Sequence, residues 1–129
     1  MSTTPGRPLI LVFDDDLVGR PDYLESLPAE FVYRANADDA LADIAAVQPV
    51  MVFMDYSMNG TMDGAQAVQV IRKVYPFAQL PIIGISSDVR MNRQMLMVGA
   101  SDSAPKASLV ERFGDLLVLL EDDLDDDED

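Results

Sequence analysis

Three apolar, strand-like runs of the chain, and a further strand-like segment near residues 100–104, are followed by side chains that could carry out phosphoryl chemistry. Those side chains are Asp14, Asp15, Asp55, Ser86 and Lys106. A carboxylate is ionised at neutral pH, so an aspartate can attack phosphorus without a general base. Neighbouring carboxylates also suit Mg²⁺ or Mn²⁺, hard cations that prefer oxygen ligands. The hydroxyl and the ammonium group could bind phosphoryl oxygens.

An alternation of strands and helices must bring these side chains together. Strand-like segments recur near residues 8–13, 30–35, 49–54, 80–86 and 100–104. They are nearly uniformly apolar where best defined, as expected for strands covered on both faces. Helical periodicity lies between them, which predicts an α/β fold with a doubly wound, five-stranded parallel sheet flanked by helices. Because the carboxyl ends of parallel strands meet at one edge, the candidate side chains should converge there.

Local signals predict where the helices begin and end. A Gly-Arg-Pro triplet ending at Pro21 interrupts the stretch after the acidic residues. We therefore expect a short first helix from Pro21 to about Leu27. Asn36 should cap a helix that runs to about Val47, and Asp63 should open the next one.

The composition narrows the possible functions. The 129 residues include 23 acids and 9 bases, for a net charge of −14, and no cysteine or histidine. Thiolate and imidazole metal ligands are therefore excluded, and the negative charge argues against direct DNA binding. No apolar run approaches the ~20 residues that a membrane-spanning helix needs. We expect a cytoplasmic protein that does not interact with membranes.

A single domain over residues 8–120 is expected, with a flexible leader at 1–7 and an acidic tail at 121–129. The tail carries eight acids in nine positions. Because like charges repel one another, we expect it to be extended and disordered. It could serve solubility alone or bind a basic partner.

In their order along the chain, these residues resemble the receiver domain of bacterial two-component response regulators, across about residues 8–120. The resemblance rests on Asp14-Asp15, Asp55, Ser86 and Lys106, and on Met58, Asp63-Gly64 and Gly99-Ala100-Ser101. It implies the flavodoxin-like receiver fold, with strand order 2-1-3-4-5. It also implies a single-domain response regulator that signals through contacts with an unknown downstream protein. Such a protein is not an enzyme beyond its own phosphorylation and dephosphorylation.

The resemblance assigns a role to each acid. Asp55 would accept the phosphoryl group from a sensor histidine kinase or a histidine phosphotransfer protein. Asp15, Asp55 and the backbone carbonyl of Ser57 would bind Mg²⁺ (or Mn²⁺), and Asp14 would act through a metal-bound water. Without the resemblance, Asp55 could be only a turn or helix-cap residue.

Two further side chains would bind the phosphoryl group in such a protein. Lys106 would pair with Asp55 at rest and with a phosphoryl oxygen afterwards. The Ser86 hydroxyl would bind another phosphoryl oxygen and draw its loop inward. Ser57 and Asp88 occupy positions that influence the phosphoryl lifetime. Taken alone, Ser86 could be a turn former and Lys106 an exposed lysine.

The sequence departs from the family pattern at four places. The loop after Asp55 is one residue longer, with Asn59 in place of proline, and should be softer. Lys106 lacks the proline that follows it in the family and has Pro105 before it, which could aim the lysine differently. Ser103 replaces the aromatic residue of the fifth strand. The first helix, on which phosphodonors dock, is short.

The helix at residues 88–98 is the candidate interaction surface, because it carries Met91, Met95 and Met97. Met95 and Met97 are about 200° apart on a helix with ~3.6 residues per turn, so at least one should be exposed. Adaptable methionine side chains suit partner binding. Together with the fifth strand and the last helix, this helix could also form a homodimer.

Two other functions fit parts of the sequence. A pseudo-receiver would keep the fold and bind partners without phosphorylation, which the missing aromatic and proline residues favour. A haloacid-dehalogenase-like phosphatase would use Asp14 as its nucleophile, because residues 14–18 fit that family's D-x-D-x-V motif. The phosphatase reading leaves Asp55 unexplained.

Overall fold

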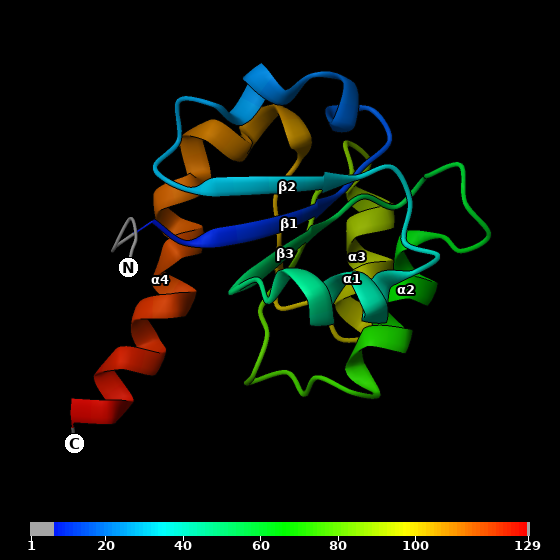
Figure 1. The fold of residues 1–129 in the computed structure, drawn as a ribbon. Helices are drawn as coiled ribbons and strands as arrows, with labels where there is room; N and C mark the ends of the chain where they lie inside the picture. Colours follow the sequence, from blue (N-terminus) through cyan, green and yellow to red (C-terminus); the bar gives the residue numbers. More distant parts are fainter. Residues whose placement is uncertain (1–6, 129) are drawn as a thin grey trace.

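The structure is a computed structural model that describes residues 7–128, and the side chains of residues 7–120. Five parallel strands form one sheet in the order β2-β1-β3-β4-β5, and helices cover both of its faces (Figure 1). The strands are β1 (Leu9–Phe13), β2 (Glu30–Arg34), β3 (Met51–Met54), β4 (Ile82–Gly84) and β5 (Asp102–Ser103). The helices are α1 (Ala40–Val47), α2 (Gly64–Arg72), α3 (Val89–Met97) and α4 (Leu109–Glu128). The predicted fold and strand order are confirmed.

The register of the sheet aligns the carboxyl ends of the strands. Phe13 at the end of β1 pairs with Met54 of β3, and Met54 pairs with Gly84 of β4. Gly84 in turn pairs with Ser103 at the end of β5. The residues that follow these strands therefore emerge at the same edge, as expected for a parallel sheet.

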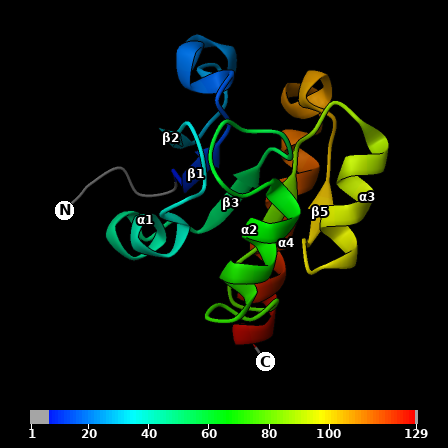
Figure 2. The same ribbon diagram turned by 90° about the vertical axis from the view of Figure 1, so that its right-hand side faces the viewer.

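Alternate residues of the central strands feed two separate cores. One core lies between the sheet and α4, and it includes Val12, Phe53, Ile83 and Phe113. The other lies beneath α1, α2 and α3 and is built from the intervening strand residues. Residues of α4 lie only in the first core and residues of α1, α2 and α3 only in the second, so α4 covers the opposite face of the sheet from the other three helices. Helix α3 lies beside β5 (Figure 2). Strands buried on both faces explain why the central runs are uniformly apolar.

The predicted short first helix begins at Pro21 as expected, but its predicted end at about Leu27 is wrong. Two short 3-10 helices, η1 (Leu17–Gly19) and η2 (Pro21–Leu24), connect β1 to β2. Pro21 does begin a helical turn, but Pro28 lies too close for an α-helix to repay its nucleation cost. The segment is held by burial instead, since Leu17, Leu24 and Leu27 lie in the core under the sheet.

The predicted cap of α1 is also wrong. The helix begins at Ala40, and the Asn36 side chain accepts a hydrogen bond from the Asp38 amide at 3.1 Å, in the turn before it. An asparagine that bonds two residues ahead stabilises a turn rather than a helix start. The predicted cap at Asp63 is confirmed, because Asp63 and Gln66 form a reciprocal capping box at the start of α2.

The two ends of the chain bear on the predicted domain limits. Helix α4 continues to Glu128, whereas the sequence predicts an extended tail from residue 121. Side chains beyond residue 120 and nearly all of the leader lie outside what the structure describes, so both limits stay predictions. Within the described part, none of the helices has the length and apolar character that a bilayer-spanning segment requires.

Candidate functional site

Three carboxylates from two strand ends meet at the carboxyl edge of the sheet. Asp14 and Asp15 follow β1, Asp55 follows β3, and each offers an oxygen within 4.8 Å of the others. Asp14 has no exposed surface and Asp55 only 7%. The backbone fixes their relative positions, since the Asp55 amide donates to the Phe13 carbonyl at 2.9 Å and so extends the β1–β3 pairing.

The ammonium group of Lys106 lies among these acids. Its Nζ atom is 2.8 Å from Asp14 Oδ2, 3.6 Å from Asp55 Oδ2 and 3.8 Å from Asp16 Oδ2. Lys106 begins a 3-10 turn, η3 (Lys106–Ser108), directly after Pro105. The proline before the lysine therefore does not direct its side chain away from the acids.

Burial and charge repulsion perturb the ionisation of the central acid. The pKa of Asp55 is raised to about 6. Burial is the largest cause and the negative charge of Asp14 acts in the same direction, whereas Lys106 and the Tyr56 amide lower the pKa. For Lys106, burial lowers the pKa, but contact with Asp14 and attraction to Asp55 outweigh it, so the net direction is upward. The lysine is therefore a permanent cation, while Asp55 titrates close to neutrality.

The cluster fits a hard divalent cation. Asp14 Oδ1 accepts hydrogen bonds from the amides of Asp16 (2.8 Å) and Leu17 (3.1 Å), which fix its orientation. Among the described residues, no hydrogen-bond donor is well aligned with the buried Asp14 Oδ2 atom, although Lys106 Nζ lies 2.8 Å from it. A buried anionic oxygen beside two further carboxylates is an environment in which a hard cation is stabilised. Asp14, Asp15 and Asp55 therefore form a group that could hold such a cation.

Ser86 lies at the same edge of the sheet, but its hydroxyl is hydrogen-bonded to a residue outside the acidic cluster. It follows β4 next to Asp55, because the Ile85 amide bonds to the Met54 carbonyl at 2.9 Å. Its hydroxyl accepts a hydrogen bond from the Asp88 amide at 3.0 Å, and no hydrogen bond among the described residues joins it to Asp55. The side chain is only 7% exposed, so it faces the interior of the site.

The side chain of Asp88 has a local structural role. It accepts a hydrogen bond from the Arg90 amide as the cap of α3, and pairs with the Arg90 guanidinium at 3.1 Å. Hydrogen bonding to Arg90 lowers the pKa of Asp88. Its predicted influence on phosphoryl lifetime, like that of the exposed Ser57, stays a prediction.

The long loop after Asp55 is tied to a neighbouring loop. The Thr61 amide and hydroxyl both donate to Asp38 Oδ1, at 2.8 and 3.0 Å. Gly60 packs so closely that an added Cβ would lie 2.6 Å from Asp38 Oδ1. These contacts anchor the middle of a loop that the sequence predicts to be soft, and its mobility stays a prediction.

The predicted methionine surface is wrong for one of its members. Met95 is fully buried in the core beneath α3, whereas Met97 is 79% exposed and Met91 is half-buried. The inward face of α3 is set by Asn92 and Met95, which places Met97 on the opposite side. Ser103 lies at the position where the family has an aromatic residue. It is half-buried, and its backbone carbonyl accepts a hydrogen bond from the guanidinium group of Arg112 in α4 at 2.9 Å.

Two residues near the site were missed by the sequence analysis. The Tyr23 hydroxyl, from η2, donates to the Lys106 carbonyl at 2.8 Å and holds the backbone of the lysine. Asn92 is buried and binds the Ser86 backbone. Neither residue has a signal in the sequence, because both bind backbone groups and the burial of Asn92 depends on which face of α3 points inward.

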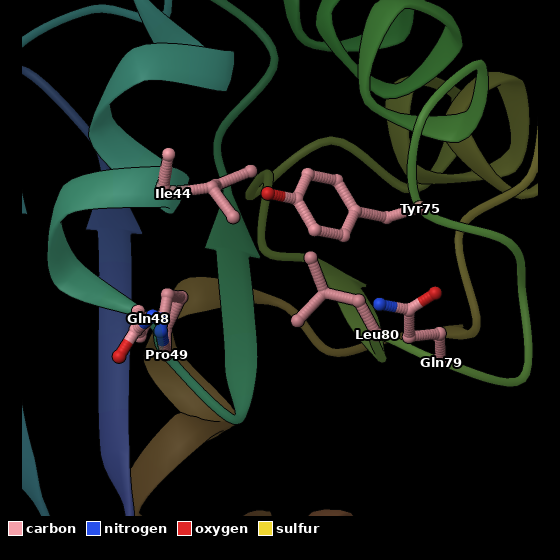
Figure 3. A pocket seen from close by; sticks show the side chains of 7 residues that line it. Ile44, Gln48, Pro49, Tyr75, Gln79 and Leu80 are labelled. Atoms are coloured by element: carbon pink, nitrogen blue, oxygen red, sulfur yellow. The ribbon is translucent and has the colours of Figure 1, made fainter.

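A separate cavity of about 360 Å³ lies at the opposite edge of the sheet (Figure 3). Its lining residues are Ile44, Ala45, Gln48, Pro49, Tyr75, Gln79 and Leu80. Pro49 and Leu80 precede β3 and β4, so the cavity faces the amino ends of the strands. It contains none of the acids described above and is not part of this site.

Comparison with solved structures identifies the family of folds to which this structure is similar. No protein-family model matches the chain, and no curated protein matches it in sequence. A crystal structure of NtrX from Brucella abortus is 28% identical, with a TM-score of 0.70, over 95% of this chain and 28% of that chain. This chain therefore spans little more than a quarter of NtrX.

Two other solved structures match over almost their whole length. A two-component response regulator from Clostridium difficile is 19% identical, with a TM-score of 0.73, over 89% of this chain and 97% of its own. The chemotaxis protein CheY4 from Vibrio cholerae is 20% identical, with a TM-score of 0.71, over 87% of this chain and all of its own. At these identities the likeness shows the fold, which is that of receiver domains.

Proposed function

We propose that this chain, which has the fold of response-regulator receiver domains, accepts a phosphoryl group on Asp55 and signals through protein contacts. The donor would be the phosphohistidine of a sensor kinase or of a histidine phosphotransfer protein. The proposal includes a cytoplasmic location in a bacterial two-component system and a protein as the downstream partner.

One observation carries this proposal. The carboxylates of Asp14, Asp15 and Asp55 have oxygens within 4.8 Å of one another, and Lys106 Nζ is 3.6 Å from Asp55. Three separate chain segments thus bring Asp55, the adjacent Asp14 and Asp15, and the Lys106 ammonium group to one edge of the fold, which supports the proposed roles. A solvated acidic loop would have no reason to bury Asp14 completely.

The metal belongs to the proposal as well. Asp15 and Asp55, with Asp14 nearby and the Ser57 carbonyl as a further ligand, would hold Mg²⁺ or Mn²⁺. When bound, the cation neutralises charge on the phosphoryl oxygens and so permits an anion to approach an anionic donor.

The protein residues supply the nucleophile and bind the group that it receives. A carboxylate oxygen of Asp55 forms a bond to phosphorus while the phosphorus–nitrogen bond of the donor breaks and its electron pair returns to the imidazole. Lys106 then exchanges one carboxylate partner for a phosphoryl oxygen. The Ser86 hydroxyl donates its proton to another phosphoryl oxygen, and its movement toward that oxygen moves its loop.

Burial of Asp14 argues against the phosphatase alternative. A nucleophile must touch its substrate, but Asp14 has no exposed surface, and its two oxygens face backbone amides and Lys106. Asp55, at 7%, has more exposed surface than Asp14. A pseudo-receiver is favoured by the replacement of the switch aromatic by Ser103, and the experiment below separates it from the proposed function.

Intact-mass measurement after treatment with acetyl phosphate and Mg²⁺ tests the proposal. The wild type should gain the mass of one phosphoryl group, and the gain should disappear with EDTA or with Asp55→Asn. Asp63→Asn, an acid eight positions away that caps α2, is the matched control and should be modified like the wild type. An unmodified wild-type chain would support the pseudo-receiver.

A further inference from the structure

Asn92 is a buried polar residue that the proposed function does not use. Four polar or charged side chains are buried in the described part of the chain, namely Asp14, Asp55, Ser86 and Asn92. The first three belong to the site. Asn92 lies on α3 with 3% of its surface exposed, and a buried amide is retained only where its hydrogen bonds are satisfied.

Both hydrogen-bonding groups of the Asn92 amide bind one residue of the site. Asn92 Oδ1 accepts from the Ser86 amide at 2.8 Å, and Asn92 Nδ2 donates to the Ser86 carbonyl at 2.9 Å. The strand β4 has ended at Gly84, so Ser86 has no backbone partner of its own in the sheet. The Asn92 amide takes the place of that missing partner.

The local sequence leaves room for this arrangement. A Cβ added to Gly84 would lie 3.1 Å from Asn92 Oδ1 and 2.9 Å from the Met95 methyl group. Glycine therefore lets α3 approach the end of β4 closely enough for the amide to reach Ser86. The helix and the strand end are joined by close packing and by two directional bonds.

Ser86 is attached to α3 by two links of different kinds. The first joins its hydroxyl oxygen, as acceptor, to the Asp88 amide at the start of α3. A phosphoryl oxygen would accept the proton of the same hydroxyl, and movement of the hydroxyl toward the phosphoryl group would lengthen this first link. The second joins its backbone to Asn92, one turn further along, and involves no group that the phosphoryl oxygen needs. Lengthening of the first link leaves the second intact.

We propose that Asn92 is the positioning residue that couples Ser86 to α3, so that movement of Ser86 toward the phosphoryl group carries the helix with it. This inference rests on the proposed phosphorylation of Asp55. It supplies a route from the site to the exposed side of α3, where Val89, Leu96 and Met97 lie. The route does not need an aromatic residue at Ser103.

The methionines of α3 make this coupling measurable. Met95 packs against Gly84 and Gly64 inside the fold, and Met97 is exposed on the other side of the helix. Their ¹³C-labelled methyl groups can be followed by NMR before and after addition of beryllofluoride with Mg²⁺. Bound beryllofluoride is counted separately by its ¹⁹F signal, which does not depend on α3.

In the wild type, the Met95 methyl resonance should shift when beryllofluoride binds. In Asn92→Ala, beryllofluoride should still bind, but the Met95 shift should fall to less than half of its wild-type size. Arg93→Ala, an exposed neighbour on the same helix, should keep the full shift. Should Asn92→Ala not fold, Asn92→Asp, which keeps the acceptor and loses the donor, should give the same reduction.

Two results would overturn the inference. One is a full Met95 shift in folded Asn92→Ala or Asn92→Asp protein with beryllofluoride bound. The other is a wild-type Met95 resonance that does not move although the ¹⁹F signal shows binding. A wild type that binds no beryllofluoride contradicts the proposed function itself, and the coupling then fails with it.

Discussion

Lys106 pairs more closely with Asp14 than with Asp55, at 2.8 Å against 3.6 Å. The resting lysine therefore neutralises a fully buried acid and leaves the more accessible carboxylate of Asp55 loosely held. This difference in distance favours Asp55 as the nucleophile, because its carboxylate loses less electrostatic attraction to Lys106 when it attacks phosphorus. It also makes the lysine important for the stability of the metal-free protein.

Removal of the lysine charge should destabilise the protein. Lys106→Met leaves Asp14 buried without a counter-ion, which should lower the free energy of unfolding by about 3 kcal/mol in metal-free buffer. Mg²⁺ should stabilise this variant more than the wild type, since the cation replaces the lost charge. Urea unfolding with and without Mg²⁺ measures both effects. Lys73→Met, at an exposed lysine, is the control, and an equal loss in the two variants would contradict the account.

The pH dependence of stability follows from the raised pKa of Asp55. Between about pH 4 and 6 the unfolded chain is ionised at this residue while the folded protein, with a pKa of about 6, keeps the proton. The folded state then binds more protons, so the free energy of unfolding should fall as the pH rises through this window. The fall should approach 2–3 kcal/mol, since each pKa unit corresponds to about 1.4 kcal/mol. Above pH 6 it should level off.

Asp55→Asn removes this titration and provides the comparison. The variant should lack the fall between pH 4 and 6 and be more stable than the wild type at pH 7. Urea unfolding of both proteins at half-unit pH intervals measures the difference. Parallel curves would show that Asp55 ionises normally in the folded protein.

Mg²⁺ should stabilise the folded protein through the carboxylate cluster. A cation at one hundred times its dissociation constant adds about 2.7 kcal/mol to the free energy of unfolding. Below pH 6 a proton must leave Asp55 for the cation to bind, so the affinity should fall by up to about tenfold per pH unit. Asp15→Asn should weaken the stabilisation strongly, and Asp39→Asn, an exposed acid before α1, should not. Equal effects of the two changes would place the cation elsewhere.

Two glycines should respond in opposite ways to alanine. A Cβ at Gly64 would collide with the Asp55 carbonyl oxygen and lie 2.8 Å from the Tyr56 Cα, so Gly64→Ala should cost about 3 kcal/mol or more. Gly114 lies in α4 with no atom within 4 Å of an added Cβ. Gly114→Ala should stabilise the protein by about 0.5–1 kcal/mol. Thermal unfolding of the pair tests the close packing around Asp55, which a stable Gly64→Ala protein would contradict.

The sequence predicts the site where chemistry follows directly from strand ends. Asp14 and Asp55 each follow a uniformly apolar run, and the parallel pairing of β1 with β3 necessarily brings them together. The sequence also indicates that Lys106 lies at this edge. Its closer pairing with Asp14 than with Asp55 depends on side-chain packing, which no pattern in the sequence reveals.

Predictions that depend on tertiary contacts succeeded less well. The segment after β1 has helical residues, yet two prolines and the burial of Leu17 and Leu24 give 3-10 turns instead. Met95 could not be separated from Met97 until the inward face of α3 was known. Asn92 was missed because its partners are the backbone groups of Ser86, which have no signature in the sequence.

The most direct measurement of the central claim is the location of the phosphoryl group after acetyl phosphate treatment. Reduction of the acyl phosphate with borohydride, followed by peptide mass spectrometry, identifies the modified aspartate. The account predicts a single Mg²⁺-dependent modification at Asp55, with none at Asp14 or Asp15. Modification at Asp14, or a folded, Mg²⁺-saturated chain that takes up no phosphoryl group, would contradict it.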